Sequence, residues 1–435
     1  MDLTLGLRTL AVNATSGWYA PAYTEPMDSI LLLATDHTSA LPSRFDGYPD
    51  TPTAVQAEMA KALHPHVRVR VLVTPGSHEQ LRFEAALARA GVPRPLPANI
   101  SFLPVKHCDI WARDAGPIWL RHRGSGARRM VKPTYTLWGY LVGGPRGRGH
   151  VDGPWASCDV PNTVPDQLAP LLSVPVEDAS PFKTEGGDKS FNGRGTVLMS
   201  LAVERQRHPG LSVAQIEKLA RTHLKAAHVV WIDQGVQDDE QSFRGPLRGG
   251  ANGEQPLYTA IGTGGHVDEA ARFVGPRTVV VPQLTAAQAA ESRVGAVTAA
   301  RMDANAKLLE GQTDEEGRPL RVERMPFPEE LTLKVNRSDE VFTLLMQLPE
   351  LKLDADAEIE IVLAASYTNY VVANGVVLVP QYDRPGRPKR FAEADQRALS
   401  ALGRLFPGRK IVGINAEPVN AGGGGLNCIS NNMPA

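Results

Sequence analysis

Cysteine is scarce in this sequence. Only Cys108, Cys158 and Cys428 occur among 435 residues, and no two of them stand at C-x-x-C spacing. Zinc knuckles and thioredoxin-like motifs need such pairs, and a disulfide framework usually needs an even set of four or more cysteines. We therefore expect no zinc knuckle, no thioredoxin-like motif and no disulfide framework.

Long apolar runs are also missing. The longest stretch without a charged side chain, residues 361–382, contains Ser366, Thr368 and Asn369 and is too polar to span a membrane. No basic segment followed by an apolar one opens the chain, so we expect no signal peptide and a cytoplasmic location. A secreted or periplasmic location stays open if Met1 is not the natural start.

Neither sign of charge is in excess. Lys and Arg number 46 and Asp and Glu number 47, which gives a formal net charge of −1. This balance argues against nucleic acid and anionic membranes as general partners. The basic run at residues 384–390 is expected to be a solvated loop.

The residues that are present indicate an α/β protein, because strand-like and helix-like segments alternate along the chain. Periodicity predicts strands over residues 29–34, 67–73, 99–105, 228–232, 278–281 and 410–414, and helices over residues 53–63, 77–90, 212–226 and 391–406. Ser212 and Gln215 form a capping-box signature. Asn374 and Gly375 favour a type I′ turn in a hairpin over residues 371–379. We expect one domain, 1–435, with insertions at 234–265 and 310–358 that form surface loops or lids.

Four short segments carry side chains that can do chemistry. They are residues 111–117 (WARDAGP), 185–188 (EGGD), 265–268 (GHVD) and 422–428 (GGGGLNC). Together they offer a thiol, an imidazole and four carboxylates, which is the usual make-up of a thiol nucleophile with its acid/base partner.

Each segment also has a plainer interpretation. Cys428 alone could be a small buried side chain, and His266 with Asp268 could be a surface pair. The EGGD segment could be a turn, and Arg113 could stack on an aromatic ring beside an ion-paired Asp114. Cys108 is a rival nucleophile, but it lacks glycine-rich surroundings. The combination and order of the segments therefore carry the functional interpretation.

The segments in this order resemble the agmatine deiminase and Porphyromonas-type peptidylarginine deiminase family, within the guanidino-group-modifying superfamily. Further matches are GHVDEAARF at 265–273, SYTN and ANG within 366–375, and PAYTEP at 21–26. The resemblance spans nearly the whole chain. It implies a pentein fold, a pseudo-fivefold α/β propeller that forms a single domain with long inserted loops.

The resemblance also implies roles for individual residues. Asp114 and Asp268 match the two aspartates that bind the substrate guanidinium, a planar cation with forked N–H donors. Cys428 matches the nucleophile, His266 the acid/base and Glu185 the group that orients the histidine. The product is a ureido group plus ammonia. The residues expected to line the substrate pocket are Trp111, Arg113, Asn369 and Asn374.

The charge on the two aspartates makes a further prediction. Nearby negative charge disfavours a thiolate, so the pKa of Cys428 should be raised in the empty enzyme. A bound guanidinium cancels that charge. We therefore expect the thiolate to form mainly in the substrate complex.

Two departures from the family pattern bear on the substrate. Residues 260–265 hold no acid where agmatine deiminases commonly have an acidic stretch, and Asn427 replaces the histidine that commonly precedes the cysteine. Fewer acids near the mouth weaken the case for a second cationic end on the substrate. A peptidyl-arginine or another guanidino compound is therefore favoured over strict agmatine.

Other functions remain open at this stage. They include an agmatine deiminase, an amidinotransferase and a non-catalytic guanidine-binding protein. A metal hydrolase using His266 and Asp268 is disfavoured, because no second histidine stands at ligand spacing nearby. We expect no cofactor and no metal, and a homo-oligomer is compatible with the sequence.

Overall fold

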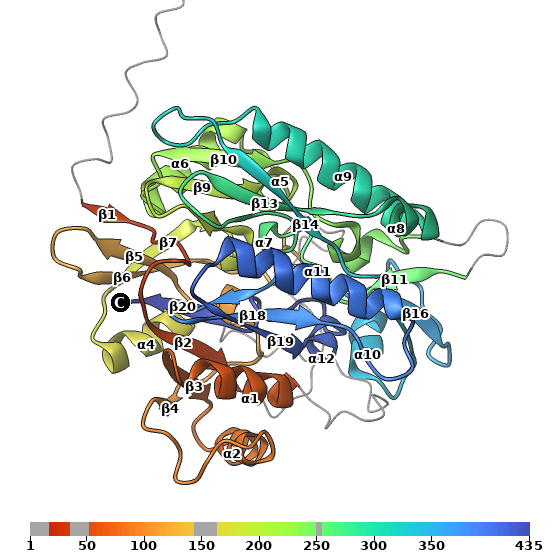
Figure 1. Ribbon diagram of the computed structural model, residues 1–435, viewed down its shortest axis with the longest axis horizontal. Helices are drawn as coiled ribbons and strands as arrows, with labels where there is room; N and C mark the ends of the chain where they lie inside the picture. The colour runs from red at the N-terminus through yellow and green to blue at the C-terminus, as the bar shows by residue number, and fades with distance from the viewer. Residues whose placement is uncertain (1–16, 35–51, 143–162, 249–254) are drawn as a thin grey trace, which may run out of the picture.

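The computed structural model describes residues 17–34, 52–142, 163–248 and 255–435, which form a mixed α/β fold (Figure 1). Six small sheets are present within these ranges. Three-stranded sheets are formed by β8 (Ser190–Phe191), β9 (Thr196–Ser200) and β10 (His228–Ile232); by β12 (Arg272–Phe273), β13 (Thr278–Gln283) and β14 (Arg321–Pro326); by β17 (Val371–Val372), β18 (Val376–Gln381) and β19 (Lys410–Asn415); and by β11 (Leu257–Thr259), β15 (Thr332–Val335) and β16 (Ile359–Val362). Four-stranded sheets are formed by β20 (Asn431–Pro434), β2 (Met27–Leu33), β3 (Arg68–Val73) and β4 (Ile100–Pro104), and by β1 (Trp18–Tyr19), β5 (Ile118–His122), β6 (Arg128–Thr134) and β7 (Val176–Lys183).

One pairing pattern recurs in all six described sheets. A central strand pairs antiparallel with one neighbour and parallel with the other, as β18 does with β17 and β19. The same arrangement surrounds β9, β13, β16, β2 and β6. The final strand, β20, pairs with β2, so the end of the chain returns to its beginning (Figure 1).

The helices fall into two groups. The longer ones pack beside the sheets; in Figure 1, α9 lies along the upper edge of the molecule and α11 crosses the front. They are α1 (Pro52–Leu63), α2 (Glu79–Arg89), α4 (Val164–Leu172), α5 (Leu201–Arg207), α6 (Val213–His223), α8 (Ala286–Glu291), α9 (Arg293–Glu310), α10 (Glu340–Met346) and α11 (Lys389–Leu405). The short ones are largely buried: α3 (Ala112–Ala115), α7 (Val267–Ala270), α12 (Glu417–Asn420) and the 3₁₀ turns η2 (Gly186–Asp188), η3 (Gln237–Asp239) and η4 (Ser242–Arg244).

Apolar strands supply most of the core. Five consecutive residues of β18, from Val376 to Pro380, are buried, and β2 and β3 join the same cluster. Burying one such aliphatic side chain contributes about 1.5–3 kcal/mol. This packing gives the short buried helices a rigid base.

Most of the predicted elements are confirmed. Helix α6 begins with the expected capping box, in which the Ser212 hydroxyl accepts from the Gln215 amide and the Gln215 side chain accepts from the Ser212 amide. No helix within the described ranges has both the length and the apolar character needed to cross a membrane.

The hairpin between β17 and β18 is present, but its turn differs from the prediction. Neither Asn374 nor Gly375 has a positive φ, so the turn is not type I′. The need for glycine is steric, because a Cβ at Gly375 would overlap the His66 imidazole.

The two segments expected to be surface insertions are built into the fold. Residues 310–358 contribute β14 and β15 to two sheets. The described part of 234–265 contains β11 and η3, and its Gln237, Asp238 and Asp239 side chains are buried. The two segments are rich in polar residues, as loops are, because their strands are short and some of their acids are buried.

Candidate active site

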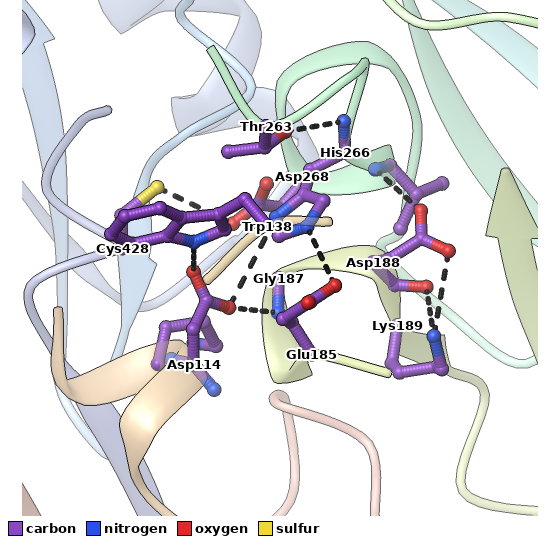
Figure 2. Close-up of polar contacts among 12 residues, drawn as sticks. Asp114, Trp138, Glu185, Gly187, Asp188, Lys189, Thr263, His266, Asp268 and Cys428 are labelled. Carbon is purple, nitrogen blue, oxygen red and sulfur yellow. Dashed lines mark hydrogen bonds and ion pairs between the residues drawn. The ribbon is translucent and has the colours of Figure 1, made fainter. Parts of the chain in front are cut away.

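Four connections between elements deliver the chemistry-bearing side chains to one place (Figure 2). Asp114 lies on α3, and Glu185 directly precedes η2. His266 directly precedes α7, which carries Asp268. Cys428 lies between α12 and β20. The five side chains are all at least nine-tenths buried.

The His266 ring lies between two carboxylates. Its Nε2 is 3.4 Å from Glu185 Oε2, and its Nδ1 is 4.0 Å from Asp114 Oδ1 (Figure 2). Nδ1 has no hydrogen-bond partner among the described residues. Burial alone would lower the pKa of His266, but Asp114 and Glu185 outweigh it and raise the pKa to about 9. The raised pKa favours the positively charged imidazolium at neutral pH.

Glu185 is held by a buried cation. Arg207, at the end of α5, points its Nε at both carboxylate oxygens, at 3.1 and 3.0 Å, and Thr136 donates its hydroxyl to Oε1 at 3.2 Å. Burial alone would raise the pKa of Glu185, yet Arg207 and His266 lower it to about 2. Glu185 is thus a fixed anion behind the histidine.

The main chain around His266 is anchored by two more acids. Asp239 accepts from the His266 amide at 2.9 Å and from the Thr263 hydroxyl at 2.5 Å. Asp188 accepts from the Val267 amide at 3.2 Å, and Lys189 lies 3.4 Å from its Oδ2. Burial raises the pKa of Asp239 to about 6 and that of Asp188 to about 7, although Lys189 opposes the second shift.

Asp114 receives a donor on each oxygen. The Gly187 amide donates to Oδ1 at 2.8 Å, and the Trp138 indole donates to Oδ2 at 2.8 Å (Figure 2). Trp138 and its neighbour Leu137 have φ values of 52° and 49°, in the left-handed region that non-glycine residues rarely adopt. Burial raises the pKa of Asp114, while the positive charge on His266 opposes the shift.

Only one of the two Asp268 carboxylate oxygens has a hydrogen-bond donor among the described residues. Asn427 donates its amide to Oδ2 at 2.7 Å, and Oδ1 has no hydrogen-bond partner among the described residues. A buried carboxylate oxygen without a donor is costly unless a ligand supplies one. This oxygen is therefore available to an N–H group or a cation.

The Cys428 sulfur lies among acceptors and one amide. It is 3.8 Å from Asp268 Oδ2, 3.9 Å from Glu269 Oε1 and 3.2 Å from Asn369 Nδ2. Burial raises the pKa of the thiol well above its ordinary value, and the carboxylates of Asp268, Glu269 and Asp114 add to the shift. The raised pKa that the sequence predicts is thus supported, with a third acid that the sequence did not indicate.

The glycine run before Cys428 allows close packing. A Cβ at Gly424 would lie 2.7 Å from the Trp111 ring and 3.1 Å from the Cys428 sulfur. A Cβ at Gly425 would lie 2.6 Å from Asn369 Oδ1. Side chains at either position would force the sulfur or its neighbours to move.

Two residues expected to contact substrate have other positions. Arg113 turns toward the C-terminal loop, donates to the main-chain and side-chain oxygens of Asn427 at 3.3 and 3.1 Å, and donates to Asn432. Asn374 lies outside the cluster, because its side chain bonds the main-chain N and O of Met27 at 2.8 and 2.9 Å. By contrast, Asn369 does lie beside the sulfur, and the Trp111 ring and the sulfur both approach Gly424.

The rival nucleophile Cys108 is not available to the cluster. Cys108 is disulfide-bonded, which the cysteine spacing did not predict, and a bonded sulfur is not available as a nucleophile. Cys158 lies outside the described residues.

Five residues of the site were missed or left without a role by the sequence analysis: Trp138, Arg207, Asp239, Glu269 and Asn427. Trp138, Arg207 and Asp239 stand in none of the chemistry-bearing segments. Glu269 and Asn427 stand in two of the quoted segments, but each acts through a contact with a distant part of the chain. For Glu269, the signal available was its position directly after Asp268.

Asp268, Glu269 and Cys428 have potential ligand atoms within 4.8 Å of one another. We do not assign them as metal ligands, because two amide donors already point at this group. Asn427 donates to Asp268, and Asn369 donates to Glu269 at 2.7 Å. The arrangement suits N–H donors and a flat cation better than a metal ion.

Comparison with known proteins gives a consistent result. The model of the family described as Porphyromonas-type peptidyl-arginine deiminase matches residues 20–244 and 253–434. A Lactococcus lactis protein provisionally named agmatine deiminase is 28% identical over 423 residues, covering 96% of each chain. An Enterococcus faecalis protein of the same provisional name is 27% identical over 423 residues, again covering 96% of each.

Solved structures share the fold. An X-ray structure provisionally named agmatine deiminase matches with a TM-score of 0.71 at 25% identity over 96% of both chains. The agmatine deiminase of Enterococcus faecalis matches with a TM-score of 0.69 at 24% identity, also over 96% of both chains. A provisionally named arginine deiminase of Porphyromonas gingivalis matches with a TM-score of 0.66 at 22% identity, over 96% of this chain and 98% of that one.

Proposed function

The chain belongs to the Porphyromonas-type peptidyl-arginine deiminase family, and on that premise we propose that it hydrolyses a terminal guanidinium to a ureido group and ammonia. The observation that carries the proposal is the grouping around one buried sulfur. Cys428 lies 3.8 Å from Asp268, and the His266 ring lies between Asp114 and Glu185. A thiol, a charged imidazole and two acids are what the displacement of ammonia from a guanidinium requires.

The two aspartates would bind the cation. A guanidinium presents five N–H donors in one plane, and carboxylates pair with it through parallel hydrogen bonds. Asp268 Oδ1 has no donor among the described residues, and each Asp114 oxygen keeps a second lone pair beside its existing donor. Binding the cation also relieves the repulsion between the buried acids.

Cys428 would attack the guanidinium carbon. The Sγ–C bond forms, the C–N bond breaks, and the nitrogen leaves as ammonia with a proton from His266. A covalent thiouronium remains on Cys428. Because the pKa of the thiol is raised in the empty site, the arriving cation would itself favour the thiolate.

His266 would serve both halves of the reaction. After giving up its proton it can take one from water, whose oxygen then bonds to the thiouronium carbon and displaces the sulfur. Its Nδ1 faces Asp114, where the guanidinium would bind, and Glu185 holds Nε2 on the opposite side. The raised pKa of His266, about 9, supports its role as the acid in the first half.

The substrate tail is the finer part of the proposal. A peptidyl-arginine or another guanidino compound is our first candidate, since residues 260–265 hold no acid for a second cationic end. Agmatine is the second candidate, because the relatives that are 27–28% identical carry that name.

We further propose that the sheets close into a ring with pseudo-fivefold symmetry. Five sheets, centred on β2, β6, β9, β13 and β18, share the antiparallel-and-parallel pairing, and the sheet of β11, β15 and β16 is an addition to them. This fivefold recurrence and the return of β20 to β2 support a repeated, closed architecture.

Incubation with agmatine, free arginine and an arginine peptide with blocked ends tests the proposal. At least one should yield equal amounts of ureido product and ammonia, and Cys428→Ala should yield neither. Amidine transfer to glycine or ornithine would indicate an amidinotransferase instead. If none of the three compounds gives product, the proposed function fails.

A further inference from the structure

The surroundings of the sulfur include a carboxyl that the proposed mechanism does not use. Glu269 follows Asp268 on α7, and its Oε1 is 3.9 Å from the Cys428 sulfur. The corresponding distance from Asp268 Oδ2 is 3.8 Å. The Glu269 side chain is buried, and its Oε2 has no hydrogen-bond partner among the described residues.

The position of Glu269 is closely defined. Its main-chain oxygen accepts from the Ser366 hydroxyl at 2.8 Å and from the Thr368 hydroxyl at 2.6 Å. Its Oε1 accepts from Asn369 Nδ2 at 2.7 Å, and the same nitrogen lies 3.2 Å from the sulfur. One amide thus bridges the carboxyl and the thiol.

The surroundings of Glu269 raise the affinity of its carboxylate for a proton. Burial raises its pKa well above the ordinary value, and the carboxylates of Asp268, Asp239 and Asp238 add to the shift. Arg272 opposes the shift, and Tyr382 is the other titratable group that faces it. An ionised carboxylate with a raised pKa accepts a proton more readily than an exposed one, so this role requires Glu269 to be ionised when the cation binds.

On this geometry, and resting on the proposed deimination, we propose that Glu269 accepts the thiol proton of Cys428 when the guanidinium binds. The other proton acceptors near the sulfur already have another task. Asp268 must remain an anion to bind the cation, and its Oδ2 already receives the Asn427 amide. His266 already carries the proton that it gives to ammonia. Solvent is remote from the sulfur, because Cys428 is only 4% exposed.

The protons balance over the cycle. The S–H bond breaks and an O–H bond forms on Glu269, which leaves the thiolate to attack carbon. His266 loses one proton to the leaving nitrogen and regains one from the attacking water. The remaining proton of that water returns to the sulfur as the ureido product forms. The proton on Glu269 then leaves with ammonia as ammonium.

The pH dependence of thiol alkylation tests this transfer. 2-Chloroacetamidinium is a flat cation that carries its own alkylating carbon, so it can bind in the guanidinium site and react there with the buried sulfur, with loss of chloride. This reagent should alkylate wild-type Cys428 at a rate nearly independent of pH between about 6.5 and 8.5, because the thiol proton stays within the site. A rise of about tenfold per pH unit in the wild type would show transfer to solvent and overturn the proposal.

The variant Glu269→Gln keeps the size of the side chain and an acceptor for Asn369, but it cannot take a proton. Its alkylation by 2-chloroacetamidinium should rise about tenfold per pH unit, and its kcat at pH 7 should fall about 100-fold with KM changed less than about threefold. If the role of Glu269 were purely structural, the alkylation rate would depend on pH in the same way in the variant and in the wild type. Glu329→Gln, which removes another buried carboxyl with a raised pKa, should behave like the wild type.

The two proposals fail in different ways. If the wild type releases no ammonia from any guanidine, the deiminase proposal fails, while the alkylation slopes still report on Glu269. If the wild type is active and Glu269→Gln matches it in kcat and in slope, the role of Glu269 fails alone.

Discussion

At the residue scale, the His266 ring lies between two carboxylates, and its protonation decides which half of the reaction it can serve. Both carboxylates favour the imidazolium, and Glu185 is itself held as an anion by Arg207. In the proposed mechanism, the acid of the first half is therefore favoured in its charged form before the substrate arrives. This arrangement links activity to pH in a direction that can be measured.

The first prediction concerns the alkaline limb of the pH profile. In the free enzyme, kcat/KM should fall as pH rises through about 9, because His266 then loses the proton that it supplies to ammonia. Glu185→Gln removes one of the charges that raise the pKa of His266. The fall in kcat/KM should therefore occur at a pH at least about one unit lower.

Thermal unfolding of Glu185→Gln serves as the control, because the variant leaves Arg207 buried without its anion. A wild-type profile that stays flat to pH 10, or a limb that does not move in the folded variant, contradicts this role for His266.

The sequence could predict residues that stand in motifs and could not predict residues that act through the fold. Cys428, His266 and the acids in the GHVD and WARD segments stand beside glycines at distinctive spacing. Arg207 ends an ordinary helix, and only folding brings it to Glu185. Arg113 was expected to contact substrate, and its type and position suit a structural task equally well. In the fold its guanidinium donates to Asn427 and Asn432.

At the element scale, the turn η2 brings main chain within contact distance of two functional side chains. A Cβ at Gly187 would lie 2.5 Å from His266 Nδ1 and 2.9 Å from Asp114 Oδ1. The φ of Gly187 is not positive, so the requirement for glycine is steric.

The second prediction follows from this close approach. Gly187→Ala should lower kcat/KM at least about 100-fold, because the methyl group displaces the imidazole or the carboxylate by part of an ångström. Gly275→Ala is the matched control, since the atoms nearest its Cβ are 3.9 Å and 4.0 Å away. The steric explanation is wrong if the two variants keep similar activity.

Elements with strong local signals could be predicted, and elements stabilised mainly by contacts could not. Helix α6 has a capping box and a clear apolar face, and its prediction is confirmed. Helix α9 was missed because its buried side chains, such as Val294, Met302 and Leu309, are widely spaced among small and polar residues. Strands β14 and β15 lie in a charged stretch, and their pairing with distant strands defines them.

At the scale of the whole molecule, the site concentrates buried acids whose charged forms oppose folding. Burial, with Asp239 beside it, raises the pKa of Asp238 to about 8, and burial raises that of Asp188 to about 7. The folded state therefore binds protons that the unfolded chain has already released above about pH 4.

The third prediction is a loss of stability toward alkaline pH. A raised folded-state pKa stabilises the fold at low pH, and that stabilisation is lost as pH rises toward the folded value. For Asp238 the loss runs between about pH 4 and 8, and His266 adds a loss between about 6.5 and 9. The melting temperature should therefore fall from pH 5 to pH 9.

Asp238→Asn should reduce this fall, because the variant has no carboxylate to ionise. The exposed Asp356→Asn should leave the slope unchanged and serves as the control. If the melting temperature falls equally with pH in the wild type and in both variants, Asp238 does not titrate as proposed.

The central claim is that Cys428 carries the guanidine carbon during turnover. The most direct test is mass spectrometry of enzyme quenched with acid while it turns over whichever guanidine yields ureido product. Tryptic cleavage after Lys410 releases residues 411–435, in which Cys428 is the sole cysteine. We predict that this peptide gains the mass of the substrate less ammonia, that the added mass disappears once substrate is exhausted, and that Cys428→Ser shows neither adduct nor product. Continued turnover by Cys428→Ser, with no adduct on the wild-type peptide, would contradict the account.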